Sequence, residues 1–114
     1  MSRHDPIVRV RHMVDNAREA VEMVRNRSRT DLDTDRMLNL ALLRLMEVVG
    51  EAASWIPEEF RSRHPQVPWR DVADLRNRLI HGYDTVNLDI LWAILRQDLP
   101  PLIEQLDAII EEEA

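Results

Sequence analysis

Apolar residues recur every three or four positions along most of the chain, and this spacing constrains the fold more than any other feature. Residues so spaced lie on one side of an α-helix, because the helix turns once in about 3.6 residues. The first such stretch begins at Ile7 and predicts a helix from about Asp5 to Arg27. Its apolar positions are Val10, Val14, Ala17, Val21 and Val24.

A second apolar stripe follows the polar cluster at residues 28–33. Asp33 or Thr34 is expected to cap the start of this helix, because its side-chain oxygen can accept backbone N–H bonds. Pro57 ends or interrupts the helix. The charged stretch EEFRSRH predicts a brief helical turn after it. The buried face of the second helix consists of Leu38, Ala41, Leu42, Leu45, Val49, Ala52 and Ile56.

A third helix is expected to open near Pro68 and to bury Val72, Leu75 and Leu79. Gly82 is well placed to stop it, because glycine readily adopts the left-handed conformation at a helix end.

A fourth helix begins at about Asn87 or Leu88, and the Pro100-Pro101 pair should kink or restart it with Asp98 near the new N-terminus. We therefore expect an all-α antiparallel four-helix bundle, with a short extra helical turn and a kinked last helix, as one domain over residues 1–114. The core-facing residues of the fourth helix are Leu91, Leu95, Leu99, Leu102, Leu106 and Ile109.

Composition supports this fold class and indicates where in the cell the protein is expected. Glycine occurs only twice, and Leu, Ala, Arg and Glu, which lose little side-chain freedom in a helix, are abundant. Cysteine is absent, and no apolar run approaches the roughly 20 residues of a membrane span. We expect a soluble cytoplasmic protein that makes no membrane contact.

Charge alternates along the chain, although the net charge is −6. Residues 1–29 and 61–81 each carry +3, whereas residues 30–60 carry −5 and residues 82–114 carry −7. The net value argues against a general nucleic-acid coat protein, which needs basic groups to displace counterions from phosphates. Two interpretations of the basic blocks remain open: pairing with acidic faces of the bundle, or a localised groove that binds anions.

Residues 76–84, with the sequence RNRLIHGYD, carry the side chains best suited to chemistry. His81 can take or give a proton near neutral pH, and Arg76 offers a fork of donors for a phosphate. RNA supplies its own nucleophile, the 2′-hydroxyl. Cleavage of RNA with these groups therefore requires neither a serine nor a metal.

The spacing within this segment bears on whether the segment of a single chain can form a complete active site. On an ideal helix Arg76 and His81 would lie about 140° apart and about 7.5 Å apart along the axis, whereas Asn77 and His81 would share a face. Arg76 reaches the same phosphate only if its side chain wraps round or if a second subunit contributes. A symmetric dimer would bring two copies of the segment to one cleft.

The run RNRLIHGYD resembles the motif of HEPN ribonucleases, in which four to six residues separate an Arg from a His and a polar residue follows the Arg. Its His-Gly-Tyr ending is similar to that of the HepT subgroup. The resemblance covers nearly the whole chain, including RHMVDNAREA, DLDTDRMLNLALLR, VVGEAAS, PWRDVADLRNRLIHGYDTVNLDILW and DLPPLI.

This resemblance implies a helical bundle that forms a homodimer, with the Arg and His of both subunits lining a groove. It implies that Arg76 binds or polarises the scissile phosphate of an RNA substrate, that His81 acts in general acid-base catalysis, and that Asn77 supports one of them. The implied reaction is cleavage through the 2′-hydroxyl with no metal and no cofactor.

The resemblance also implies a partner. HepT proteins are the toxins of type VII toxin-antitoxin systems, and a minimal nucleotidyltransferase of the MntA type neutralises them by adding AMP to the motif tyrosine. Tyr83 occupies that position and is the one tyrosine of the chain. AMP on Tyr83 would add negative charge and bulk beside His81 and so repel RNA.

Other functions stay open at this stage. The chain could be a noncatalytic HEPN subunit that binds and regulates a nucleotidyltransferase, or a dimeric helical scaffold with no link to nucleotides.

Several further residues have both a functional and an ordinary interpretation. Glu47 and Glu51 could form a carboxylate pair. Glu51 fits better either a groove residue that neutralises or positions an Arg such as Arg76, or an ordinary solvated residue. His12, Asp15 and Glu19 have helical spacings that could hold a metal, but such triplets arise often by chance.

Arginines and tryptophans are also ambiguous. Trp55, Trp69 and Trp92 fit core or interface positions better than base-stacking ones. The arginines that could contact RNA, each of which could also be an ordinary surface residue, are Arg61, Arg63, Arg70 and Arg78.

Overall fold

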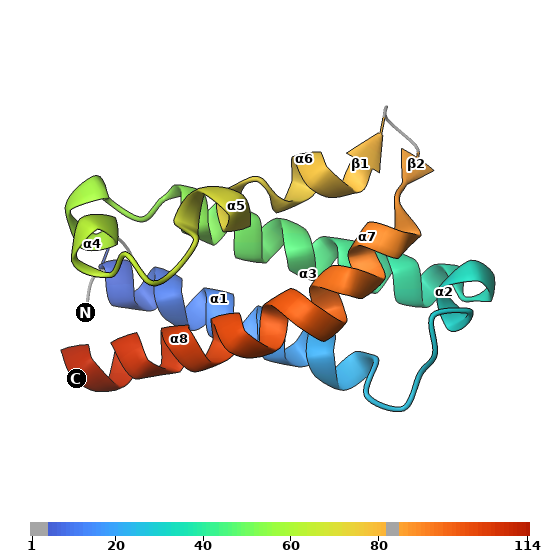
Figure 1. Ribbon diagram of the computed structural model, residues 1–114, viewed down its shortest axis with the longest axis horizontal. Coiled ribbons are helices and arrows are strands. Elements are labelled where there is room, and N and C mark those ends of the chain that lie inside the picture. The colour runs from blue at the N-terminus through green and yellow to red at the C-terminus, as the bar shows by residue number, and fades with distance from the viewer. Residues whose placement is uncertain (1–4, 82–84) are drawn as a thin grey trace.

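The computed structural model describes residues 5–81 and 85–114, and for His81 it describes the backbone alone. The described part is predominantly helical, which confirms the all-α fold class. Successive long segments run in opposite directions along the molecule, as in an antiparallel bundle (Figure 1). These segments are α1 (Pro6–Met23), α3 (Arg36–Ser54), the pair α5 (Trp69–Ala73) and α6 (Leu75–Leu79), and the run of α7 (Leu88–Ala93), η1 (Ile94–Asp98) and α8 (Leu99–Glu113).

The first helix begins where the sequence predicts and ends earlier. Asp5 caps α1, because its side chain accepts a hydrogen bond from the backbone N–H of Ile7 at 2.9 Å. The helix ends at Met23 instead of continuing to Arg27. Beyond Met23 the chain makes tighter turns, in which the N–H of Arg25 bonds the carbonyl of Glu22 three residues back.

The cap of the second long helix also differs from the prediction. Asp33 and Thr34 lie within a separate short helix, α2 (Asp31–Thr34), and therefore cannot cap α3. Asp35 has an extended backbone and accepts from the N–H of Leu38 at 2.9 Å. At its other end α3 stops at Ser54, before Pro57. The predicted short helical turn follows as α4 (Glu58–Arg63).

Apolar stripes from all four segments meet in one core, as the spacing predicts. The expected residues are buried, except that Val21 and Ala41 are only partly buried. Gly50 lets α3 approach α5 closely, because a Cβ at that position would lie 3.2 Å from the carbonyl oxygen of Val72. This contact fixes the distance between α3 and the segment that leads into α6.

The last helix is interrupted just before the proline pair. The N–H of Leu99 bonds the carbonyl of Ile94, five residues back, so one π-helical turn links α7 to α8. Pro100 and Pro101 lie in the first turn of α8, after Leu99, where their missing N–H groups cost little. The predicted kink is therefore a π-helical turn. No helix in residues 5–81 and 85–114 combines the length and apolar character needed to cross a membrane.

Candidate active site

The segment that carries the predicted chemistry is not a continuous helix. Helix α6 ends at Leu79, and Ile80 takes an extended conformation with φ −101° and ψ 124°. Ile80–His81 forms strand β1, which pairs antiparallel with strand β2, Thr85–Val86. The prediction of a helix up to Gly82 was therefore wrong.

Local sequence explains this change of conformation. Ile80 lies opposite Val86, and both are β-branched residues that favour extended backbone. The carbonyl of Leu79 also accepts a bond from the N–H of Asn87 at 2.8 Å. The loss of helical hydrogen bonds after Leu79 is thus offset by bonds across the strand pair.

The helical angle between Arg76 and His81 consequently does not apply to this chain. Asn77 and His81 do not share a helix face, because Asn77 lies in α6 and His81 in strand β1. Gly82 and Tyr83 lie outside the described residues. The placement of the predicted modification site relative to Arg76 therefore remains a prediction.

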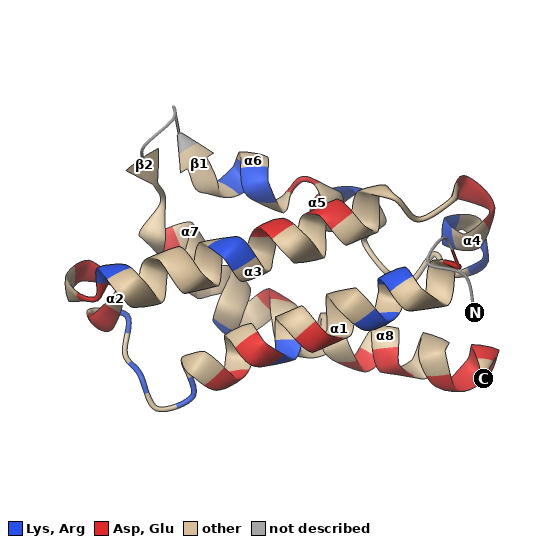
Figure 2. Cartoon of the chain, turned by 180° about the vertical axis from the view of Figure 1, so that it is seen from behind, with Lys and Arg blue, Asp and Glu red and all other residues tan. Residues whose placement is uncertain are grey.

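Arg76 is exposed on α6 and lines a hollow of about 460 Å³ between α1, α3 and α6. We call it the Arg76 hollow. Figure 2 shows α6, α3 and α1 one below another, each with basic positions. The residues that line the hollow are Arg9, His12, Arg44, Glu47, Val48, Glu51, Ala52, Trp55 and Arg76.

Glu51 lies in the same hollow as Arg76, as expected of a groove residue, but its hydrogen-bond partner is not Arg76. Its Oε1 accepts a hydrogen bond from the Nε1 of Trp55 at 2.9 Å. Glu47 lines the hollow too, and its carboxylate is 3.9 Å from the guanidinium of Arg44. The two glutamates therefore contact Arg44 of α3 and Trp55, which directly follows α3.

Asn77 is exposed beside Arg76, and its side chain bonds within its own segment. Its Nδ2 donates to the Oδ1 of Asp74 at 2.7 Å, at the start of α6. This bond holds the amide at the first turn of α6 in the described structure.

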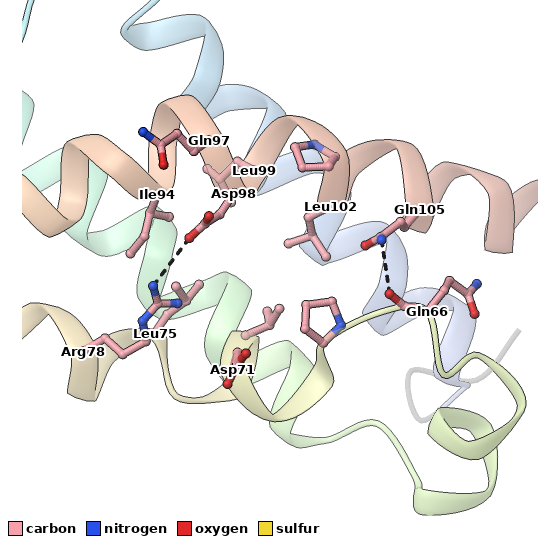
Figure 3. A pocket seen from close by; sticks show the side chains of 13 residues that line it. Gln66, Asp71, Leu75, Arg78, Ile94, Gln97, Asp98, Leu99, Leu102 and Gln105 are labelled. Carbon is pink, nitrogen blue, oxygen red and sulfur yellow. Dashed lines mark hydrogen bonds and ion pairs between the residues drawn. The ribbon is translucent and has the colours of Figure 1, made fainter.

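Arg78 lies in a different hollow from Arg76, since two residues along a helix point to nearly opposite sides. It pairs with Asp98 at 3.5 Å across a hollow of about 660 Å³ between α5, α6, η1 and α8 (Figure 3). Gln105 bonds the carbonyl of Gln66 across the same hollow at 3.1 Å.

The other predicted RNA contacts are also separate from Arg76. Arg70 and Arg61 line a third hollow beside α4 and α5. Arg63 lies 3.7 Å from Glu113 and over the ring of Phe60. The structure does not gather Arg63, Arg70 and Arg78 around Arg76.

The sequence does not link Arg76 to Arg9 and His12, the α1 residues that line the same hollow. Its spacing suggests only a metal triplet of His12, Asp15 and Glu19. In residues 5–81 and 85–114 no three His, Asp or Glu residues form a group that could hold a metal. Trp55, expected in a core or interface, is 60% exposed in the Arg76 hollow. Only the crossing of α1, α3 and α6 brings these residues together.

Part of the charge pattern reflects pairing between basic and acidic side chains of the bundle. Arg27 pairs with Asp35, and Arg29 pairs with Asp33 and Asp89. Hydrogen bonds from Arg29, first to Asp33 and then to Asp89, raise the pKa of the Arg29 guanidinium.

Arg9 and Arg76 behave differently from those paired arginines. Neither forms an ion pair with another residue in the described ranges, and both line the Arg76 hollow. The hollow thus presents two cations that the described part of the chain does not neutralise.

A family model described as HepT-like ribonuclease matches residues 13–109. The match runs from within α1 to within α8, and it contains the whole segment from Arg76 to Tyr83. The chain belongs to the HepT-like family. The family resemblance of the motif is thereby confirmed, and it extends over all four segments of the bundle.

Relatives of this HepT-like protein are similar over most of their length. A candidate RNase of Caldanaerobacter subterraneus subsp. tengcongensis is 35% identical over 102 residues, which are 90% of this chain and 91% of the relative. A candidate ribonuclease HepT of Thermococcus cleftensis is 36% identical over 88 residues, 74% of this chain and 80% of the relative. A candidate RNase of Methanocaldococcus jannaschii is 28% identical over 109 residues, 96% of this chain and the full relative. No solved structure matches the chain.

Proposed function

We propose that this HepT-like ribonuclease is the toxin of a type VII toxin-antitoxin system and cleaves RNA in the cytoplasm without a metal. The observation that carries the proposal is the family match, which includes RNRLIHGYD and extends over both sides of it. The exposed position of Arg76, with no ion-pair partner among the described residues, supports a role in binding phosphate.

The proposed reaction uses only groups of this chain and of the RNA. His81 takes the proton of the 2′-hydroxyl, whose oxygen attacks the adjacent phosphorus while the bond to the 5′-oxygen breaks. A proton then passes to that oxygen, leaving a 2′,3′-cyclic phosphate and a 5′-hydroxyl. Arg76 donates N–H bonds to the phosphate oxygens, where charge develops in the transition state, and Asn77 supports this arrangement.

We place the functional groove between two copies of the chain. The chain has 114 residues, and Arg76 and His81 lie on different elements, so that a homodimer could join the Arg of one copy to the His of the other. Arg78, Arg70 and Arg63 are proposed as weaker RNA contacts outside the Arg76 hollow, and Glu51 as groove support.

The proposed partner is an MntA-like minimal nucleotidyltransferase. It would transfer AMP from a nucleoside triphosphate to the phenol oxygen of Tyr83 and release pyrophosphate. The added phosphodiester carries negative charge, which would repel the RNA backbone near His81.

Cleavage of a labelled RNA by the purified protein tests the catalytic proposal. We expect the wild type to cleave in the presence of EDTA and to leave cyclic phosphate ends. His81→Ala and Arg76→Ala should each lower the rate by about 100-fold or more. Arg25→Ala, at an exposed residue just beyond the end of α1, is the control. Equal cleavage by the wild type and both site variants would show that the site assignment is wrong.

Co-expression with an MntA-like nucleotidyltransferase tests the control mechanism. The intact mass of the wild type should rise by one or more AMP groups, whereas Tyr83→Phe should keep its unmodified mass. A wild-type mass without AMP would contradict this mechanism. A wild type that is modified on co-expression but cleaves no RNA when purified alone without AMP would instead favour the noncatalytic HEPN subunit.

A further inference from the structure

Trp55 is an exposed aromatic side chain held in a fixed position beside Arg76. It is 60% exposed, although a tryptophan normally buries most of its surface. Glu51 accepts the hydrogen bond of its indole N–H at 2.9 Å, and the guanidinium of Arg9 lies 5.3 Å from the ring centre. These two contacts come from different helices and restrict the ring while much of its surface stays open to solvent.

A ring fixed in this way can bind a flat ligand at little entropic cost. Nucleic-acid bases stack on exposed aromatic rings, and such stacking tolerates any base because each has a π face. The ring of Trp55 already has a cation against it, so that a base could be held together with Arg9. The wall of the hollow is therefore suited to a base that is not paired in a duplex.

The arginines of the hollow supply the matching contacts for the backbone of the same ligand. Arg9 comes from α1, Arg44 from α3 and Arg76 from α6, and all three line the hollow of about 460 Å³. Arg44 is 74% exposed, and its nearest carboxylate, that of Glu47, is 3.9 Å away. Three guanidinium groups around one hollow can contact more than one phosphate.

The charge of the hollow favours a single nucleic-acid strand over an acidic protein. Its three arginines outnumber Glu47 and Glu51, and His12 adds a ring that can donate or accept a hydrogen bond. The combination of separated cations with one fixed aromatic ring is typical of sites for single strands.

We propose that the Arg76 hollow is a subsite for single-stranded RNA. An unpaired base stacks on Trp55, while Arg9 and Arg44 bind the flanking phosphates. This inference rests on the proposed ribonuclease function and deepens it. The scissile phosphate lies at Arg76, and the subsite holds a neighbouring nucleotide. Substrates would thus be unpaired RNA regions, with no need for a particular base at the stacked position.

Binding of a fluorescein-labelled 2′-O-methyl oligoribonucleotide to the full chain tests this subsite without cleavage, because the probe lacks the 2′-hydroxyl. Trp55→Ala should raise the dissociation constant by about tenfold, the loss expected when one stacked base is released. Trp55→Phe keeps a ring and should stay within about threefold of the wild type. Met37→Ala, at a residue 82% exposed on α3, is the control for loss of an exposed apolar side chain.

Salt dependence tests the phosphate contacts. Arg44→Gln should lower the slope of log binding constant against log salt by about 0.7, the value for one phosphate contact in a single strand. Arg25→Gln is a matched control, because Arg25 is 70% exposed and, like Arg44, pairs with a glutamate three residues away on the chain. That control should leave the slope unchanged.

Several results would overturn the subsite. One is that Trp55→Ala binds the probe as tightly as the wild type, and another is that the wild type fails to bind the probe. A third is that Trp55→Ala changes the molar mass of the protein, which would show that a second copy covers this face. Cleavage of natural RNA separates the two proposals. If the wild type cleaves RNA but binding of the probe does not depend on Trp55, the ribonuclease function is supported and the subsite is not. If binding of the probe depends on Trp55 but the wild type does not cleave RNA, the subsite is supported and the ribonuclease function is not.

Discussion

At the scale of single residues, position in the bundle decides what each side chain can do. Arg76 and Arg78 are chemically alike and two positions apart, but Arg78 pairs with Asp98 whereas Arg76 lines the hollow with Arg9 and Trp55. Residue type alone therefore does not distinguish a structural arginine from a candidate ligand-binding arginine.

Gly50 illustrates a residue whose role is purely steric. Gly50→Ala should lower stability by about 1 kcal/mol, because the new Cβ would lie 3.2 Å from the backbone carbonyl of Val72, and that strain exceeds the gain in helix propensity. Thermal unfolding should show a Tm lower by about 3 to 6 °C. Met37→Ala on the same helix should change Tm little, and an unchanged Tm for Gly50→Ala would mean that α5 can move away freely.

At the scale of elements, the end of α1 and the π-helical turn support each other. Arg96 of η1 donates to the carbonyls of Val24 at 2.9 Å and Arg27 at 2.8 Å, beyond the last turn of α1. Both carbonyls lie past the end of α1, and that of Val24 also accepts the N–H of Arg27 at 3.1 Å, so that the guanidinium acts as a cap supplied by a distant segment. The same guanidinium lies 4.5 Å from the ring centre of Trp92, which holds it in place.

Arg96→Met should separate α1 from this cap while keeping an apolar stem. We expect a loss of about 1 to 2 kcal/mol, since two carbonyls lose a charged donor. Hydrogen exchange should become faster in the last turn of α1. Arg25→Met removes a nearby exposed arginine and should leave exchange unchanged. Wild-type exchange in Arg96→Met would argue against a capping role.

At the scale of the whole molecule, the main question is whether one chain or two complete the active site. Arg76 is on α6 and the backbone of His81 is on β1, so that the segment changes from helix to strand between them. A dimer whose sites combine Arg76 of one copy with His81 of the other can be tested without a structure of the complex.

Mixing inactive variants tests this arrangement. Arg76→Ala and His81→Ala proteins, unfolded together and refolded, should recover about a quarter of wild-type cleavage, because half of the dimers are mixed and each contains one intact site of two. Sites built within one chain would recover none. The molar mass of each protein by light scattering verifies that dimers have formed.

The sequence by itself determined the core and the approximate position of the helices, though not all of their ends, because period and residue size are local properties. Every apolar stripe that it predicted packs inward, and the short α4 and the interruption near Pro100 follow from prolines whose effect is local. The sequence also located the motif RNRLIHGYD.

Tertiary structure alone decided two features of the candidate site. The pairing of Ile80–His81 with Thr85–Val86 ended α6 at Leu79, because hydrogen bonds to another strand replaced those of the expected helix. The crossing of α1, α3 and α6 placed Arg9 and Trp55 beside Arg76, residues that are far apart in the sequence. No local pattern encodes such a meeting, since it depends on how the buried faces pack.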